Sequence, residues 1–142
     1  MISQRAEGRA DRGFELPRDA ARVVLVLETC WSAATSSRWS AEAPSRGQCG
    51  VTALVLNDRF GGEILKTRVG DSWHYYNRVA GSRVDATEGQ FAEPPAYTDS
   101  TSSRDEAQTD CTPSQYGALS RAFAAACLPS IRRRGPARRP GR

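Results

Sequence analysis

The sequence predicts an α+β fold in which N-terminal helices pack on a small antiparallel sheet. Apolar residues before Gly62 recur at the three- and four-residue spacing of a buried helical face. After Gly62, three extended segments follow one another closely, as in a meander of strands. With 142 residues, 39% of them hydrophobic, the chain is long enough for one core but too short for a multidomain machine. Its 8% aromatic content argues against a wholly disordered chain.

Composition divides the chain into a lead-in, one domain and a tail. Residues 1–17 lack periodicity and are expected to be disordered, the domain is expected at 18–130, and residues 131–142 form a basic, disordered tail. Six of the twenty basic residues lie in the last eleven positions, and without them the net charge changes from +4 to −2. The domain itself is therefore not basic. We expect nucleic acid to be bound only nonspecifically, through the tail, if at all.

Two helices are expected in the first half of the domain. The first begins after Asp19 as N-cap, and its apolar positions fall on one face: Ala20, Val23, Val24, Leu27, Cys30 and Trp31. The second runs from Cys49 to Phe60 and stops at Gly61-Gly62. β-Branched residues within the second segment leave a strand open as the alternative there.

Three strands follow, and two helices complete the domain. The strands are expected at Glu63–Val69, Ser72–Val79 and Ser82–Ala86, with Ala80-Gly81 as a tight turn between the last two. Residues 92–103 are expected to be loop. A short helix starts near Ser103, and Thr112-Pro113 provides the N-cap and first position of a final helix that ends at Pro129.

Three residues form a candidate catalytic set: Cys49, His74 and Asp85. A cysteine in the first turn of a helix lies at the positive end of the helix dipole, which favours the thiolate. A histidine can exchange its proton, and a carboxylate can orient that histidine. If Ala80-Gly81 is a two-residue turn, Val79 pairs with Ser82. His74, Tyr76 and Asp85 then share one face of the sheet, with His74 and Asp85 as diagonal neighbours. A three-residue turn would place them on opposite faces.

The same residues have ordinary structural interpretations. A cysteine among apolar residues is often a small buried hydrophobe, and a histidine in an aromatic strand is often a core or surface residue. The four cysteines form no C-x-x-C pair and the chain has one histidine, so neither a metal nor another cofactor is expected. The apolar run at residues 23–27 is too short for a secretory signal or a membrane span. We expect a cytoplasmic protein with free thiols.

Several blocks of the sequence resemble the bacterial YunG family. They are Trp31-Ser32, Thr35-Ser36-Ser37-x-Trp39-Ser40, Pro44-x-x-Gly47-Gln48-Cys49-x-Val51-Thr52-Ala53-Leu54-Val55, Phe60-Gly61-Gly62-Glu63-Ile64-Leu65-Lys66-Thr67, His74-Tyr75-Tyr76-Asn77, Asp85-x-Thr87-x-x-Gln90-Phe91 and Ser103-Arg104-Asp105-Glu106. The match covers about residues 20–128. It departs from the family pattern at Ala43, where an asparagine is expected before Pro44.

A weaker resemblance, to papain-like and transglutaminase-like enzymes, implies a function. In that core a cysteine opens a helix, and histidine and aspartate follow on antiparallel strands. The resemblance implies a cysteine hydrolase or acyl-transferase acting on an amide, isopeptide or thioester of an unknown peptide or small molecule. Trp39, Gln48 and the backbone N–H of Cys49 become candidate oxyanion donors, and Tyr76 becomes a candidate substrate-binding residue. The alternative is a non-catalytic module that binds a ligand or protein in the same cleft.

Overall fold

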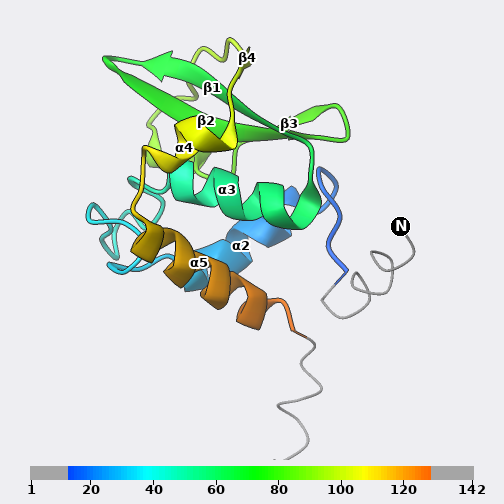
Figure 1. Cartoon of the computed structure of the whole chain (residues 1–142), viewed down its shortest axis with the longest axis vertical. Coiled ribbons are helices and arrows are strands. Elements are labelled where there is room, and N and C mark those ends of the chain that lie inside the picture. The colour runs from blue at the N-terminus through cyan, green and yellow to red at the C-terminus, as the bar shows by residue number, and fades with distance from the viewer. Residues whose placement is uncertain (1–12, 129–142) are drawn as a thin grey trace, which may run out of the picture.

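The predicted α+β architecture is confirmed. The computed structural model describes residues 13–128 (Figure 1). Within that range the elements are α2 (Ala20–Cys30), α3 (Cys49–Phe60), β1 (Glu63–Val69), β2 (Ser72–Val79), β3 (Ser82–Val84), the 3-10 helix η1 (Glu88–Gln90), β4 (Ser100–Thr101), α4 (Arg104–Gln108) and α5 (Pro113–Ala126). The segment from Cys49 to Phe60 is a helix, not the strand that its β-branched residues left open.

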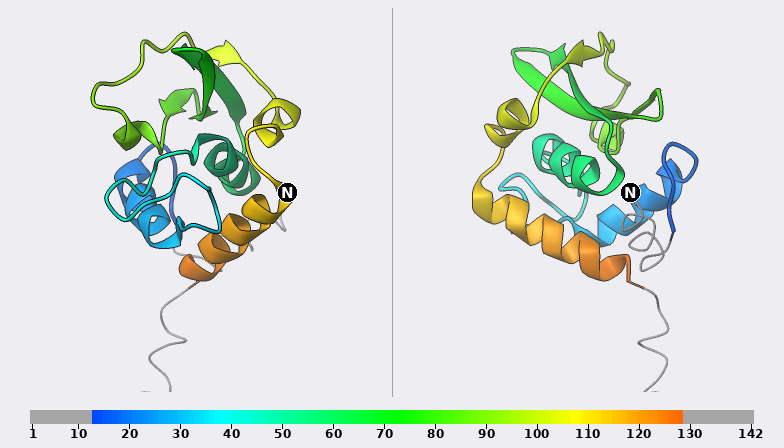
Figure 2. Two further views of the ribbon diagram at one scale, coloured as in Figure 1. Left: turned by 90° about the vertical axis from the view of Figure 1, so that its left-hand side faces the viewer. Right: turned by 45° about the vertical axis from the view of Figure 1, so that its right-hand side comes forward.

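Helix α3 lies between the sheet and the other long helices. The antiparallel sheet has the order β3-β2-β1-β4. Two views show the sheet on one side of α3 and the helices α2 and α5 on the other (Figures 1 and 2). Every residue from Gly50 to Leu56 is consequently buried, which explains a helix that is apolar on all sides. This burial fixes the start of α3 against the sheet.

The β2–β3 hairpin has the two-residue turn that the sequence predicts. Val79 pairs with Ser82, and the turn residues Ala80 and Gly81 have φ of 52° and 80°. Two positive φ angles are typical of the turns that match the twist of antiparallel strands. The ladder ends where Asn77 pairs with Val84. Earlier residues of β2 therefore have no partner in β3, and that edge is open to contacts from elsewhere.

Two local predictions were wrong, and a third was right only in part. The third strand ends at Val84 instead of Ala86, because the Asp85 carboxylate accepts a hydrogen bond from the backbone N–H of Thr87 and turns the chain out of the ladder. Residues 92–103 are not all loop, since Ser100–Thr101 pair with the free edge of β1 as β4. Asp19 is the N-cap residue of α2, as predicted, but its side chain makes no capping hydrogen bond to the helix and instead accepts one from the backbone N–H of Glu15.

The chain joins the core earlier than predicted. Leu16 is buried and packs in the cluster formed with α2, α3 and α5. Residues 13–17 therefore belong to the fold. The rest of the predicted lead-in, residues 1–12, lies outside the described residues. The predicted tail and the predicted stop at Pro129 also lie outside them; α5 itself ends at Ala126. Trp31, predicted on the apolar face of the first helix, is buried in the core, and Tyr75 is buried as well.

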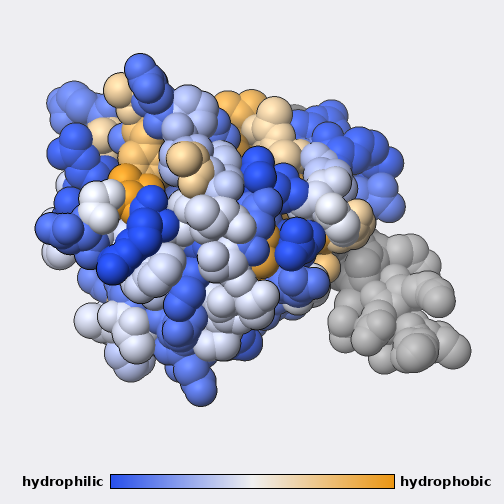
Figure 3. All heavy atoms as spheres, turned by 90° about the horizontal axis from the view of Figure 1, so that it is seen from above, coloured by the Kyte–Doolittle hydropathy of each residue, from blue (hydrophilic) through white to orange (hydrophobic). Residues whose placement is uncertain are grey.

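The surface above the sheet is largely hydrophilic. Figure 3 shows that face with small, separated hydrophobic patches among polar side chains. In the part of the chain that the structure describes, no helix has both the length and the apolar content that crossing a bilayer requires.

Candidate functional site

His74 and Asp85 form a buried pair on one face of the β2–β3 hairpin. A hydrogen bond of 2.7 Å joins His74 Nε2 to Asp85 Oδ2, and the two side chains are only 3% and 2% exposed. Asp85 Oδ2 also accepts a 2.7 Å hydrogen bond from the Tyr97 hydroxyl, while Oδ1 accepts from Thr87 N at 3.2 Å. Because the carboxylate accepts, Nε2 carries a proton and Nδ1 is the remaining ring nitrogen. The predicted diagonal contact is thus confirmed.

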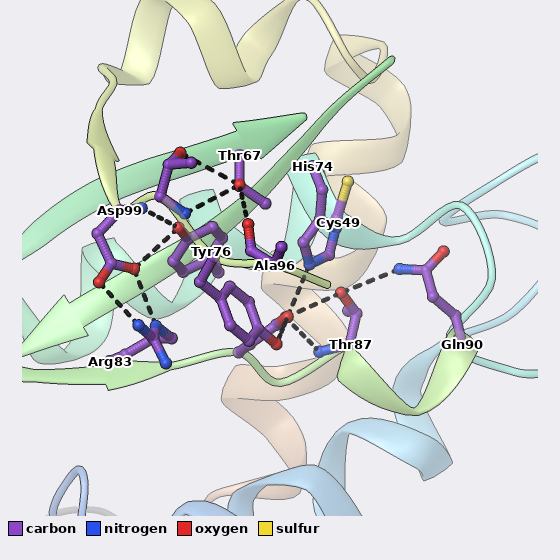
Figure 4. A network of polar contacts seen from close by, with 12 residues as sticks. Cys49, Thr67, His74, Tyr76, Arg83, Thr87, Gln90, Ala96 and Asp99 are labelled. Carbon is purple, nitrogen blue, oxygen red and sulfur yellow. Dashed lines mark hydrogen bonds and ion pairs between the residues drawn. The ribbon is translucent and has the colours of Figure 1, made fainter. Parts of the chain in front are cut away.

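Aromatic rings enclose the imidazole of His74. The ring of Tyr76 stacks on it at a centroid distance of 5.7 Å, and Phe91 meets it edge-on at 4.9 Å. The Tyr76 hydroxyl donates to Asp99 Oδ1 at 2.9 Å, and Figure 4 shows Asp99 also paired with Arg83, beside the polar contacts of His74. Tyr76 is 1% exposed and does not line the cavity described below. Its role in substrate binding stays a prediction, because in this conformation the side chain packs behind His74.

Cys49 is the first residue of α3, and the glycines at positions 47 and 50 let neighbouring side chains pack closely around it. Gly47 has φ of 75°, and a Cβ there would lie 2.5 Å from Ser36 Oγ. At Gly50, a Cβ would lie 2.5 Å from both Cβ and Oδ2 of Asp110. The Gly-Gln-Cys-Gly sequence therefore lets the 31–48 loop and Asp110 close on the start of the helix.

The surroundings of the Cys49 thiol favour its protonated form. Burial, followed by the negative charge of Asp110, raises the pKa of Cys49 to about 12. Asp110 Oδ2 lies 3.5 Å from Cys49 Sγ and accepts a 3.0 Å hydrogen bond from Gly50 N. A backbone hydrogen bond from Tyr75, on the edge of β2 that β3 leaves unpaired, acts in the opposite direction. The expectation that the helix dipole favours a thiolate is thus wrong for this environment, because burial and then the Asp110 carboxylate at the same helix terminus both raise the pKa of the thiol.

Cys49 and His74 line one cavity. Its volume is about 300 Å³, and its walls come from the 31–48 loop, the start of α3, the ends of β1 and β2, η1 and the start of α5. The lining residues are Ser36, Ser37, Arg38, Gly47, Cys49, Val69, Ser72, Trp73, His74, Gln90, Phe91, Asp110 and Gln115. Among the described residues, the hydrogen bonds of Cys49 Sγ are to Asp110 and Tyr75 rather than to His74. The structure therefore brings the two to one cavity without a direct contact.

Trp39 and Gln48 lie beside this cavity but not in its wall. Gln48 is fully buried; its Oε1 accepts a 2.9 Å hydrogen bond from Thr35. Gln48 Nε2 and Trp39 Nε1 are buried donors without an acceptor in the part of the chain that the structure describes. Such orphaned donors are uncommon in proteins. Their role as oxyanion donors stays a prediction, since neither side chain reaches the cavity surface in this conformation. The N–H of Cys49 belongs to the first turn of α3, where backbone donors lack intrahelical acceptors.

Sequence reasoning missed Asp110 and Tyr97 as partners of the candidate residues. Asp110 follows α4 and is 61 positions from Cys49, and Tyr97 lies in a segment without periodicity. The sequence did point to Gln90, because this residue belongs to one of the blocks that resemble the YunG family. Its Oε1 accepts from Gly47 N at 3.4 Å, and its Nε2 donates to Thr87 Oγ1 at 3.2 Å, which ties the Cys49 loop to the His74–Asp85 side (Figure 4).

Within residues 13–128, no group of three or more His, Cys, Asp or Glu side chains is placed to hold a metal ion.

Comparison with protein families matches residues 19–127 to the family described as YunG protein. The uncharacterized protein YunG of Bacillus subtilis (strain 168) is 50% identical over 101 residues, which cover 71% of this chain and 88% of the relative. No solved structure matches significantly. The chain belongs to the YunG family.

Proposed function

We propose that this protein is a cysteine hydrolase or acyl-transferase in which Cys49, His74 and Asp85 act on an amide, isopeptide or thioester. One observation carries the proposal: a buried, hydrogen-bonded His74–Asp85 pair lines the same cavity as a cysteine at the first position of a helix. The order of a cysteine at the start of a helix, a histidine on a strand and an aspartate directly after the next strand resembles that of papain-like and transglutaminase-like enzymes. A buried imidazole–carboxylate pair in a cleft is a frequent mark of acid–base chemistry.

The first step forms an acyl-enzyme. Cys49 Sγ attacks the carbonyl carbon while its proton moves to His74 Nδ1, the ring nitrogen that Asp85 leaves available. The thiol needs this base because, with a pKa of about 12, almost none of it is ionised at neutral pH. Asp85 stabilises the imidazolium that results and holds the ring in the required tautomer. As the carbon–leaving-group bond breaks, His74 returns the proton to the leaving amine or thiol.

The second step releases the acyl group. A water molecule or an acceptor amine attacks the thioester carbonyl, His74 takes the proton of the attacking group, and Cys49 leaves and recovers a proton from His74. The backbone N–H of Cys49 is the first candidate to stabilise the oxyanion of both tetrahedral intermediates, because it lies at the positive end of α3. Trp39 and Gln48 each hold an unpartnered N–H nearby, so both stay candidates for a second donor once substrate is bound.

The proposal is tested by the rate at which iodoacetamide alkylates Cys49, measured by peptide mass spectrometry at several pH values. The wild-type protein is expected to react at least about a hundredfold faster than His74→Ala near neutral pH, which is the lower end of what a general base contributes. Cys111, which is also partly exposed, is the internal control and should react equally in both proteins. Equal Cys49 rates in the two proteins would overturn the catalytic proposal.

A second candidate, a non-catalytic binding module, is favoured by the raised pKa of Cys49, because a protonated, partly buried thiol is also what an inert cysteine shows. Equal alkylation rates, together with retained binding of small amides or peptides in the cavity, would establish this alternative.

A further inference from the structure

Asp110 is a charged wall of the cavity beside the proposed nucleophile. Its Oδ2 lies 3.5 Å from Cys49 Sγ, and no other carboxylate is among the described residues that line the cavity. Asp110 makes no ion pair with a described residue, and its hydrogen bonds are to the Cys49 thiol and Gly50 N. Burial raises the pKa of Asp110, while the charges of His74 and Arg38, which line the same cavity, lower it without forming an ion pair with it. The carboxylate is thus available to a ligand.

Close approach of Asp110 depends on the sequence around Cys49. A Cβ at position 50 would lie 2.5 Å from two atoms of Asp110, so only glycine permits this position of the carboxylate. A negative charge here raises the pKa of the thiol and so acts against ionisation of the nucleophile. Asp110 thus disfavours the thiolate form of Cys49 and can lie there only because residue 50 is glycine. A positive charge on the substrate that pairs with the carboxylate would explain this arrangement.

Resting on the function proposed above, we infer that Asp110 selects substrates whose acyl group carries a free α-ammonium. In such a group the nitrogen is two bonds from the carbonyl carbon. When that carbon joins Cys49 Sγ, the nitrogen can lie within hydrogen-bond distance of a carboxylate oxygen 3.5 Å from the sulfur. A charge-assisted hydrogen bond between ammonium and carboxylate is among the stronger polar contacts in proteins. A cavity of about 300 Å³ is at the small end of ligand sites and suits one aminoacyl group.

Charge selection at Cys49 is tested with two methanethiosulfonate reagents, a trimethylammonium-ethyl and a sulfonato-ethyl derivative. Each forms a disulfide with the thiol and releases methanesulfinate, so only the reagent charge differs. The variant is Asp110→Asn, whose amide oxygen can still accept from Gly50 N. The control, Glu28→Gln, removes one exposed carboxylate on α2, outside the cavity wall. At low ionic strength, the cation-to-anion rate ratio at Cys49 is expected to fall about tenfold in Asp110→Asn and to stay constant in the control.

The substrate class is tested with two thioesters, alanine benzyl thioester and its N-acetyl form, by following acylation of Cys49 with intact-mass spectrometry. Wild-type protein is expected to accept the free-amino form at least about tenfold faster, because removing one partner of a charge-assisted contact costs about that factor or more. Asp110→Asn should lose this preference. The ratio of the two rates is the readout, because loss of the Asp110 charge also lowers the pKa of Cys49 and so changes the rate for both thioesters. A preference that persists in Asp110→Asn would overturn the inference, as would equal rates for both thioesters in the wild type.

Failure of the inference and failure of the proposed function give different results. If His74→Ala slows alkylation but Asp110→Asn leaves the reagent ratio unchanged, the catalytic proposal stands and the role of Asp110 is overturned. If the reagent ratio depends on Asp110 but neither thioester acylates Cys49, the carboxylate sets the charge of the cavity and the acyl-transfer proposal is overturned. Failure of both reagents to reach Cys49 overturns the inference, because the site would then be closed.

Discussion

Replacing Asp85 by asparagine should reverse the tautomer of His74. In the wild type, Oδ2 accepts from His74 Nε2 and from the Tyr97 hydroxyl, and Oδ1 accepts from Thr87 N. An asparagine has only one oxygen, and Thr87 N requires an acceptor because a backbone donor cannot be withdrawn. The amide NH₂ then faces His74, so Nε2 must accept and the ring proton moves to Nδ1. The nitrogen proposed to take the Cys49 proton is thereby occupied.

The stability cost follows from the burial of the pair. Both side chains are at most 3% exposed, so the charge-assisted bonds of Asp85 are not replaced by water when the charge is lost. Hydrogen bonds to charged groups contribute about 1.5–3 kcal/mol each, so we expect Asp85→Asn to lower the free energy of unfolding by about 2–4 kcal/mol. Tyr97→Phe removes one hydroxyl from the same carboxylate and should cost about 1–2 kcal/mol without changing the tautomer. Urea unfolding measures both values.

The tautomer can be read directly, because His74 is the only histidine of the chain. The ¹⁵N shifts of its two ring nitrogens should show a proton on Nε2 in the wild type and in Tyr97→Phe, and on Nδ1 in Asp85→Asn. Iodoacetamide should alkylate Cys49 at least about tenfold more slowly in Asp85→Asn, and nearly at the wild-type rate in Tyr97→Phe. A folded Asp85→Asn protein with the proton on Nδ1 and a wild-type rate would refute the argument that Nδ1 accepts the thiol proton.

Three further predictions concern the start of α3 and its supports. Gly50→Ala should destabilise the protein by about 1–3 kcal/mol in urea unfolding by forcing Asp110 away, whereas Gly89→Ala, with open space at its Cβ, should not. Burial and Asp110 raise the pKa of Cys49 from 9.0 to about 12, so the folded state keeps a proton that the unfolded chain releases. The free energy of unfolding should therefore fall above about pH 9, and Cys49→Ser should reduce that fall by at most about 1.4 kcal/mol per pH unit. Thr112→Ala, which breaks the capping box of α5, should cost about 1 kcal/mol and leave Cys49 alkylation unchanged, showing that lost stability alone does not slow the thiol.

The elements that the sequence predicted well are those whose geometry is set locally. A two-residue turn at Ala80-Gly81 fixes which residues of β2 and β3 face the same side, so the contact between His74 and Asp85 followed from counting. Strands β1 and β2 have the predicted bounds for the same reason, because their alternation and their flanking glycines are local signals. The short strand β4 was missed because two residues carry no periodicity; they pair only because β1 offers an open edge.

The surroundings of Cys49 could not be predicted from local signals. Asp110 reaches the thiol through the packing of α4 and α5 around α3, and nothing near position 110 marks that contact. Tyr97 reaches Asp85 because the segment before β4 crosses the face of the sheet that carries His74. The expectation of a thiolate failed for this reason. A helix dipole is visible in the sequence, whereas the opposing carboxylate depends on tertiary structure.

The reactivity proposed for Cys49 depends on several of these contacts in succession. Gly50 lacks a side chain, so Asp110 can approach the first turn of α3. That carboxylate and burial keep the thiol protonated, so attack on a carbonyl requires a base in the cavity. We assign that role to His74, which lines the cavity and whose free nitrogen is set by Asp85. A cation that neutralises Asp110 would remove part of the charge that raises the pKa of Cys49. The substrate class inferred for this site would therefore also make its own nucleophile easier to ionise on binding.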